Sequence, residues 1–443
     1  MDLRALGLYL HVPFCIGKCR YCDFLSFPAP AWAQEAYWAA LLRELELRGG
    51  EYAAYEVVSV FIGGGTPSLA PGEWIAELME RIRERFRLAD GAEVTIEGNP
   101  GTADGEKFAA YRAAGVNRLS IGLQSALDEE LRLLGRAHTF RQFEEAYRAA
   151  REAGFRNVNV DLMSALPGQS RAAYQKTLRA VLDLEPLPEH ISAYSLIVEE
   201  GTPFGELLRK GELSLPDEDT DRQMYADTAR ELQKKGFRRY EVSNYARAGY
   251  ECRHNCGCWQ RREYAGFGLG AASLVRNVRF SNTRDLAAYL EMFGKGREGG
   301  AKARRGIRGA QGGSGEAAKG FRGAQGGSGE AEKGIHGAER DLGETEESFR
   351  EAVQELTQAE QMEEFMFLGL RLTEGVSSRQ FRETFHVELP DIYGRVLERS
   401  RKEGLLRLDS VEARTAGETA DLRIRLTDRG VDLSNYVLAR FLL

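Results

Sequence analysis

Six short segments rich in apolar and β-branched residues, each followed by a longer amphipathic segment, constrain the fold of this chain more than any other feature. Helical patterns follow the segments, for example Gln34–Leu47 after the first and Gly72–Phe86 after the second. This alternation is typical of βαβ units around a parallel sheet. We therefore predict an α/β fold whose strands are Leu6–Val12, Val57–Ile62, Glu93–Glu97, Arg118–Ile121, Asn157–Leu162 and His190–Leu196.

Three cysteines follow the first predicted strand in a C-x3-C-x2-C pattern, Cys15, Cys19 and Cys22. An iron–sulfur cluster used only for electron transfer and a structural zinc ion normally take four protein ligands. Three thiolates therefore leave one coordination position open, where a cofactor or substrate can bind. The alternative is a zinc site with His11 as the fourth ligand, although this cysteine spacing is not usual for zinc.

The other three cysteines form a second tight group, around His254. Such clustering favours metal or cluster chemistry in a reducing compartment over a disulfide scaffold. In an extended segment the four alternating side chains would face one side, which makes a second metal site one interpretation. The favoured interpretation is that Cys252 and Cys256 are small, semi-buried residues without a ligand role, while the role of Cys258 stays open.

Charge and hydropathy exclude some classes of partner. The 443 residues include 60 Lys and Arg against 67 Asp and Glu, a net charge of −7, so no basic field favours nucleic acid or an anionic membrane surface. No window approaches the roughly 18 consecutive apolar residues of a spanning helix, and the N-terminus lacks the features of a signal peptide. We expect a cytoplasmic protein with no membrane span and no nucleic-acid partner.

Composition divides the chain into four regions. A Gly-rich repeat of low apolar content predicts a disordered insert over 295–350, between a connecting region over 241–294 and a C-terminal domain over 351–443. We expect residues 1–240 to form the main domain. In the C-terminal region the acidic residues among the arginines favour a packing or partner domain over nucleic-acid binding. Three helices and two strands predict a winged-helix-like module there, at Glu364–Leu372, Ser377–Phe385, Leu389–Gly404, Leu405–Leu408 and Leu422–Thr427.

Polar side chains and glycines follow several of the predicted strands. Because active sites of parallel α/β folds lie at the carboxyl ends of the strands, these residues predict one shared pocket. Glycines there allow a ligand to approach the backbone without a Cβ in the way. Each polar residue alone is more often solvated or locally paired. The candidates are the cysteine loop, Gly63-Gly64-Gly65-Thr66-Pro67, Glu97-Gly98-Asn99-Pro100, Gln124, Arg136 and Asp161.

The three-cysteine loop resembles that of radical S-adenosylmethionine (SAM) enzymes, in which a [4Fe-4S] cluster with one open iron binds SAM and reduces it to methionine and a 5′-deoxyadenosyl radical. Between Leu6 and Ser273, and again from Glu360, the chain resembles the oxygen-independent coproporphyrinogen III oxidase family. This resemblance implies an incomplete (β/α)6 radical SAM barrel with a small C-terminal winged-helix-like α+β domain. The motifs that carry it are Tyr9-x-His11-x-Pro13-Phe14-Cys15, the glycine triplet, Glu97-Gly98-Asn99-Pro100, Asn117–Ser125, Leu134-Gly135-Arg136-x-His138 and Asn159–Met163.

The resemblance also implies roles for individual positions. Cys15, Cys19 and Cys22 would ligate the cluster. Six residues match positions that contact the SAM bound to the cluster: Tyr9, Gly64, Glu97, Gln124, Arg136 and Asp161. Three more match positions that touch a second SAM in the true dehydrogenases: Tyr21, Gly65 and Thr66.

Two details distinguish the branches of this family. The dehydrogenases carry a further cysteine two positions after the third, where this chain has Phe24. The HemW-type haem chaperones are marked by His-Asn-x-x-Tyr-Trp, which resembles the sequence from His254 to Trp259, with Cys258 in place of tyrosine. His254 is then a candidate haem ligand, since imidazole is a common axial donor.

We therefore predict a haem chaperone that binds a [4Fe-4S] cluster, SAM and haem and transfers haem to an acceptor protein. An electron donor such as a flavodoxin or ferredoxin is a further expected partner. The alternative is an oxygen-independent coproporphyrinogen III dehydrogenase of porphyrin biosynthesis. A third, unrelated possibility is a zinc-stabilised binding module without a redox role.

Overall fold

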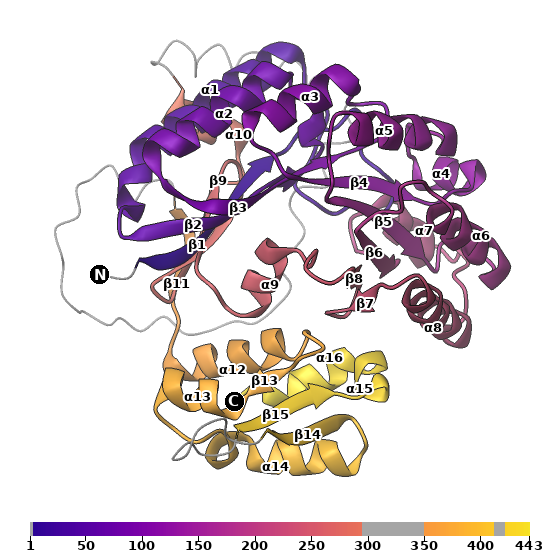
Figure 1. Cartoon of the computed structure of the whole chain (residues 1–443), viewed down its shortest axis with the longest axis vertical. Coiled ribbons are helices and arrows are strands. Elements are labelled where there is room, and N and C mark those ends of the chain that lie inside the picture. Colours follow the sequence, from indigo (N-terminus) through magenta and orange to yellow (C-terminus); the bar gives the residue numbers. More distant parts are fainter. Residues whose placement is uncertain (1–2, 295–349, 412–420) are drawn as a thin grey trace.

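The computed structural model describes residues 3–294, 350–411 and 421–443. The predicted disordered insert over 295–350 lies outside these residues, apart from its last position. Two bodies are visible in Figure 1: a large α/β body with a twelve-stranded sheet, and a smaller body that holds a three-stranded sheet.

The centre of the large sheet consists of six parallel strands that pair in chain order. All six predicted strands are confirmed, although β3 begins six residues earlier than expected, because its polar first half carries no strand pattern. Their bounds are β1 (Arg4–Val12), β2 (Tyr55–Gly64), β3 (Arg87–Gly98), β4 (Arg118–Gln124), β5 (Val158–Ser164) and β6 (His190–Ser195).

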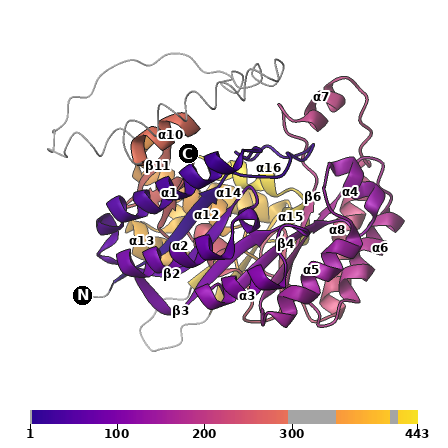
Figure 2. The same ribbon diagram turned by 90° about the horizontal axis from the view of Figure 1, so that it is seen from above.

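Helices connect these strands, and Figures 1 and 2 show α1 to α6 along one face of the sheet. Helix α5 begins at the capping box formed by Thr139 and Gln142. Its buried face carries Phe143, Tyr147 and Ala150. The helices are α1 (Ala31–Arg48), α2 (Gly72–Arg85), α3 (Gly105–Ala114), α4 (Asp128–Leu134), α5 (Phe140–Glu152), α6 (Arg171–Leu182), α7 (Pro203–Arg209) and α8 (Glu218–Lys234), with short 3-10 turns η1 (Gly49–Tyr52) and η2 (Pro67–Leu69).

Short strands extend the sheet at both ends. Because β1 pairs with β9 and β6 pairs with β8, β1 and β6 do not pair with each other, and the barrel is incomplete as predicted. Much of region 241–294 therefore belongs to the main sheet rather than only connecting two domains. The added elements are β7 (Arg238–Arg239), β8 (Asn244–Ala246), α9 (Arg253–Trp259), β9 (Tyr264–Phe267), β10 (Ala272–Val275), β11 (Val278–Asn282), α10 (Leu286–Phe293) and β12 (Arg350–Glu355).

The small body has its own apolar core and resembles the predicted winged-helix arrangement, with antiparallel strands in the order β13-β15-β14. Its first helix begins earlier than predicted because Thr357 and Glu360 form a capping box. The elements are α12 (Gln358–Gly369), β13 (Val376–Ser377), α13 (Ser378–Phe385), α14 (Leu389–Lys402), β14 (Leu406–Val411), β15 (Asp421–Leu426), α15 (Asp428–Asp432), α16 (Ser434–Leu438) and η4 (Ala439–Phe441).

No helix within the described ranges is both long enough and apolar enough to span a bilayer. The two bodies contact each other through charged groups of the sheet extension. Glu364 of α12 accepts hydrogen bonds from Arg261, at 2.8 Å, and from Arg279, at 2.6 Å.

A buried carboxylate on α1 joins the sheet extension to the barrel. Glu44 is fully buried and pairs with Arg48 on the same helix. It also accepts hydrogen bonds from the Gly268 backbone at 2.8 Å, from Asn282 at 2.7 Å and from Tyr289 at 2.7 Å. Because a buried charge is tolerated only when it is paired and hydrogen-bonded, this network fixes the strands beyond β1 against α1.

Replacement of this carboxylate should destabilise the protein. Glu44→Gln leaves the Arg48 guanidinium buried without its main counter-charge, so we expect the free energy of unfolding to fall by about 3 kcal/mol. Urea unfolding followed by far-UV circular dichroism measures the change. Glu46→Gln, at an exposed surface pair of the same helix, should change it by less than about 0.5 kcal/mol. Equal effects of the two substitutions would contradict the assigned role of Glu44.

Candidate functional site

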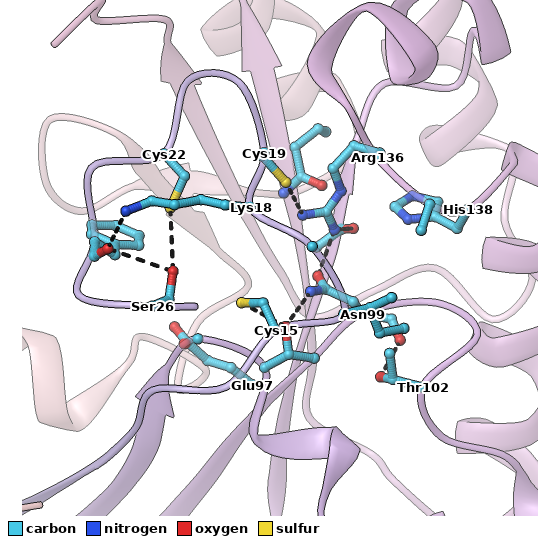
Figure 3. A pocket seen from close by; sticks show the side chains of 18 of the residues that line it. Cys15, Lys18, Cys19, Cys22, Ser26, Glu97, Asn99, Thr102, Arg136 and His138 are labelled. Carbon is cyan, nitrogen blue, oxygen red and sulfur yellow. Dashed lines mark hydrogen bonds between the residues drawn. The ribbon is translucent and has the colours of Figure 1, made fainter. Parts of the chain in front are cut away.

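A cavity of about 250 Å³ lies at the carboxyl ends of the parallel strands (Figure 3). It brings together residues from the cysteine loop and from β2, β3, β4 and β5, as the strand-end argument predicts. Eleven of the predicted site residues line it: Cys15, Cys19, Tyr21, Cys22, Gly64, Gly65, Thr66, Glu97, Gln124, Arg136 and Asp161.

Backbone hydrogen bonds hold the cysteine loop between β1 and α1 in place. The Phe27 N–H donates to Pro13 O at 2.8 Å, and the Cys15 N–H donates to Phe27 O at 3.1 Å. Further along, the Arg20 N–H donates to Leu134 O at the end of α4, at 3.0 Å. The loop is therefore tied to two parts of the barrel, and the three sulfur atoms lie around one side of the pocket (Figure 3).

Each sulfur has a polar neighbour. Thr66 Oγ1 donates to Cys15 Sγ at 3.4 Å, and Arg136 Nη1 donates to Cys19 Sγ at 3.7 Å. Cys22 Sγ lies 3.9 Å from Ser26 Oγ, and burial raises the pKa of the Cys22 thiol. Hydrogen bonds to cysteine sulfur tune the reduction potential of an iron–sulfur cluster. This set of donors therefore fits three thiolate ligands.

The zinc alternative does not fit the geometry. His11, its fourth ligand, has both ring nitrogens engaged, Nδ1 with Tyr9 OH at 2.9 Å and Nε2 with Leu25 O at 2.8 Å. Within the described ranges, no three His, Cys, Asp or Glu side chains lie close enough together to hold a single metal ion. A mononuclear site needs all its ligands on one atom, whereas the cysteines of a cluster bind separate irons. The cysteine loop therefore fits a cluster better than zinc.

The glycine loop after β2 packs directly against the cysteine loop. The Gly65 N–H donates to Val12 O at 2.8 Å, and the Thr66 N–H donates to Phe14 O at 2.7 Å. A Cβ at position 65 would lie 2.6 Å from Phe14 O, so only glycine fits there. Gly64 has φ of +112°, a conformation that favours glycine, and its N–H donates to Glu97 Oε2 at 3.1 Å.

Two carboxyl groups face the pocket. Burial, and secondly the neighbouring Asp161, raise the pKa of Glu97 to about 7. Burial also raises the pKa of Asp161, which accepts hydrogen bonds from Ser120 at 3.1 Å and Asn159 at 2.8 Å. Glu97 therefore changes its charge close to neutral pH, and it lies where a ligand can reach it.

Two polar residues of the pocket keep unused hydrogen-bonding atoms. Gln124 has φ of +68°, and its buried Oε1 has no partner among the described residues. Arg136 donates to Gly122 O at 2.8 Å and to Asn99 Oδ1, while its Nε is buried without a partner in the same part of the chain. Buried unsatisfied polar atoms are rare in native proteins. Their position here indicates that a polar ligand completes the pocket.

One pocket residue, in the strand-end motif Glu97-Gly98-Asn99-Pro100, has a role that the sequence did not predict. Asn99 donates to Thr66 Oγ1 at 2.9 Å and accepts from Arg136, so it links the glycine loop to the arginine (Figure 3). Its position two residues after Glu97, at the end of β3, was the signal available in the sequence.

Tyr9 does not line the pocket. Its hydroxyl is hydrogen-bonded to His11, and its ring stacks on Phe61 with centroids 6.3 Å apart. Burial, together with Glu97, raises the pKa of the Tyr9 phenol above its ordinary value. Tyr9 thus lies behind the pocket wall, on the inner face of the sheet.

His254 also lies outside the pocket, against the middle of β2. The residue is 7% exposed, and its Nδ1 is 3.1 Å from Ser59 Oγ. Ser59 precedes Gly64 by five residues in β2, a rise of about 16 Å along the strand. Burial lowers the pKa of His254 to about 4, so the imidazole is neutral at neutral pH.

The extended conformation that a second metal site at Cys252–Cys258 would require is not present. Residues Arg253–Trp259 form the helix α9, with Cys252 at its N-cap. In a helix, residues four apart share a face, so Cys252 lies above Cys256 and His254 above Cys258. The four side chains do not face one side, and the pattern that favoured a second metal site is absent from this segment.

Family models match two parts of the chain. The radical SAM superfamily model matches residues 9–181, which include the cysteine loop and most of the parallel sheet. The HemN C-terminal domain model matches residues 356–415.

The similar curated proteins include the heme chaperone HemW of Bacillus subtilis, 32% identical over 435 residues that cover 98% of each chain. The heme chaperone HemW of Mycobacterium tuberculosis is 40% identical over 296 residues, covering 66% of this chain and 75% of the relative. That of Escherichia coli is 38% identical over 297 residues, covering 66% and 77%.

Among solved structures, coproporphyrinogen III oxidase (HemN) from Escherichia coli, a radical SAM enzyme, matches with a TM-score of 0.73. The match covers 99% of this chain and 90% of that protein at 20% identity, and at this identity it shows the fold alone. The fold, the two family models and the relatives agree: the chain belongs to the HemW-type branch of the HemN-like radical SAM family.

Proposed function

We propose that this protein is a haem chaperone that binds a [4Fe-4S] cluster and SAM in the cysteine-lined pocket and transfers haem to an acceptor protein. The observation that carries the proposal is the pocket itself, where three unpaired cysteines on one anchored loop meet the glycine loop and two carboxyl groups. Similarity to proteins named heme chaperone supports the choice of cargo.

Cys15, Cys19 and Cys22 would hold the cluster. When bound, a cluster with an open iron supplies a binding position for SAM and an electron for its reduction. The donors at Thr66 and Arg136 would stabilise the ligating thiolates of Cys15 and Cys19. An electron donor such as a flavodoxin or ferredoxin would then be a partner of this end of the barrel.

SAM would contact the residues on the far side of the cysteines. Gly64 would offer its backbone to the methionyl part, and Glu97 would accept hydrogen bonds from the ribose hydroxyls. The unused Oε1 of Gln124 and Nε of Arg136 support polar contacts at this end, and Asp161 lies beside them. Tyr9 would support the SAM site indirectly, from outside the pocket, through its hydrogen bond with His11 and its stacking on Phe61.

Tyr21, Gly65 and Thr66 match positions that touch a second SAM in dehydrogenases. Here Thr66 is engaged with Cys15 and Asn99, and Gly65 packs on the cysteine loop. We assign Gly65 and Thr66 to support of the cluster loop. Phe24, 64% exposed where dehydrogenases have cysteine, favours the chaperone over the decarboxylating enzyme.

Haem is the cargo in this proposal, and His254 its ligand. A neutral imidazole keeps the lone pair that haem iron requires.

Cluster assembly should depend on the cysteine loop alone. Anaerobic reconstitution with iron and sulfide should give about four irons per chain, whereas Cys15→Ala, Cys19→Ala and Cys22→Ala should each lose most of them. Iron analysis and the visible spectrum measure this. Cys252→Ala, Cys256→Ala and Cys258→Ala are matched controls and should keep the cluster. Stoichiometric zinc in place of iron would contradict the proposal.

SAM binding should depend on pH through Glu97. The pKa of about 7 means that this group gains its charge as pH rises through neutrality, and a carboxylate accepts hydroxyl hydrogen bonds more strongly than a carboxylic acid. We expect the SAM dissociation constant, measured by calorimetry on the cluster-loaded protein, to fall roughly three- to tenfold between pH 6 and pH 8.

The control is Glu97→Gln, which should bind SAM more weakly and lose the pH dependence. An unchanged pH dependence in this variant would remove Glu97 from the SAM contacts.

Haem binding should depend on His254. Haem added to the purified protein should give a Soret band, and His254→Ala should shift the band and weaken binding at least tenfold, because an axial ligand is lost. Absorbance titration measures both. Turnover of coproporphyrinogen III to protoporphyrinogen by the cluster-loaded protein would instead support the dehydrogenase.

A further inference from the structure

The helix that carries His254 lies between the main sheet and the C-terminal body (Figure 1). It contacts β2 on one side and α12 on the other. We propose that Glu93 is a positioning residue that holds α9 against the barrel and so controls the access of haem to His254. This inference rests on the proposed function, in which His254 binds haem.

Glu93 anchors the first turn of α9 from a different element. Its carboxylate, 3% exposed at the centre of β3, accepts hydrogen bonds from the Arg253 N–H at 3.0 Å and from the His254 N–H at 3.0 Å. The Cys252 thiol donates to the same carboxylate at 3.5 Å. The side chain of the N-cap residue, Cys252, accepts no hydrogen bond from the backbone of the first turn.

The first N–H groups of a helix have no partner within the helix, and an anion near them is favourable. Because α9 has only seven residues, a large share of its backbone N–H groups have no partner within the helix. The Arg253 side chain adds a hydrogen bond to Gly91 O, at 2.6 Å, on the same strand. The start of α9 therefore depends on β3.

While α9 is anchored, His254 cannot receive haem. Its ring centroid is 5.2 Å from that of Phe61, and Nδ1 is hydrogen-bonded to Ser59. On the side of β1 a Cβ at Gly7 would lie only 3.3 Å from the imidazole, so the ring fills the space above this glycine. Axial ligation requires the flat face of a porphyrin against a ring nitrogen, and a histidine that is only 7% exposed does not offer such a face. The first turn of α9 must therefore leave its place before His254 binds iron.

The other end of α9 is held by the C-terminal body. The guanidinium of Arg371 lies 4.4 Å from the centre of the Trp259 ring, and Arg261 pairs with Glu364. Glu93 acts at the opposite end, where His254 lies. Loss of the Glu93 anchor can therefore release the His254 turn while the contacts with the C-terminal body remain.

A ligand that binds only the released state has an affinity and an association rate reduced by the small population of that state. Glu93→Gln keeps the shape of the side chain but removes its charge, and its amide group cannot accept from both backbone N–H groups. We therefore expect a larger population of the released state.

The first measurement uses ligand-free protein. Hydrogen exchange followed by mass spectrometry should show faster exchange of the α9 backbone amides in Glu93→Gln than in the unmodified protein. The second is stopped-flow mixing with haem, in which Glu93→Gln should associate roughly tenfold faster. This increase should disappear in Glu93→Gln combined with His254→Ala. Glu77→Gln, at an exposed position of α2, is the control and should change neither quantity.

Ser59→Ala is a second, milder variant that removes only the hydrogen bond to the imidazole. It should accelerate haem association about two- to fivefold. If Glu93→Gln does not fold, Ser59→Ala becomes the test of whether His254 must be released before haem binds. The proposal is overturned if His254→Ala weakens haem binding but a folded Glu93→Gln does not accelerate haem association, or, where Glu93→Gln does not fold, if Ser59→Ala does not accelerate it. If His254→Ala leaves haem binding of the otherwise unmodified protein unchanged, the assignment of the haem ligand fails, and this inference fails with it.

Discussion

Two backbone hydrogen bonds between the glycine loop and the cysteine loop determine where the candidate site of this protein lies. They join Gly65 and Thr66, after β2, to Val12 and Phe14, at the end of β1. Because a Cβ at position 65 would collide with Phe14 O, this close approach requires glycine. The loop that carries the cysteines is thereby fixed over the carboxyl edge of the sheet, within reach of the residues that end β3, β4 and β5.

Much of this pocket was predictable because the rules that govern it are local. A strand followed by glycine or by a polar residue can be recognised in the sequence, and parallel strands bring their carboxyl ends to one edge. Glu97, Gln124 and Asp161 were found in this way. Asn99 was found only as part of the strand-end motif that begins at Glu97, because its own role depends on two partners from other elements, Thr66 and Arg136.

The rest could not be predicted from local patterns. The segment around His254 alternates in residue type and contains glycine, both of which disfavour a helix, yet it forms α9 because Glu93, distant in the sequence, accepts its first backbone donors. The edge strands β7 and β8 are two and three residues long, too short for a recognisable alternation. Tyr9 matches a family motif, but its hydroxyl is turned to His11, behind the pocket wall.

The proposed function requires an iron–sulfur cluster with one iron that the protein does not ligate and to which SAM binds. Mössbauer spectroscopy of protein reconstituted with ⁵⁷Fe, recorded before and after SAM is added, tests it most directly. We expect a [4Fe-4S] spectrum in which the signal of one iron of the four changes when SAM binds. A cluster whose irons are all unaffected by SAM, or a protein that takes up no iron, would contradict it.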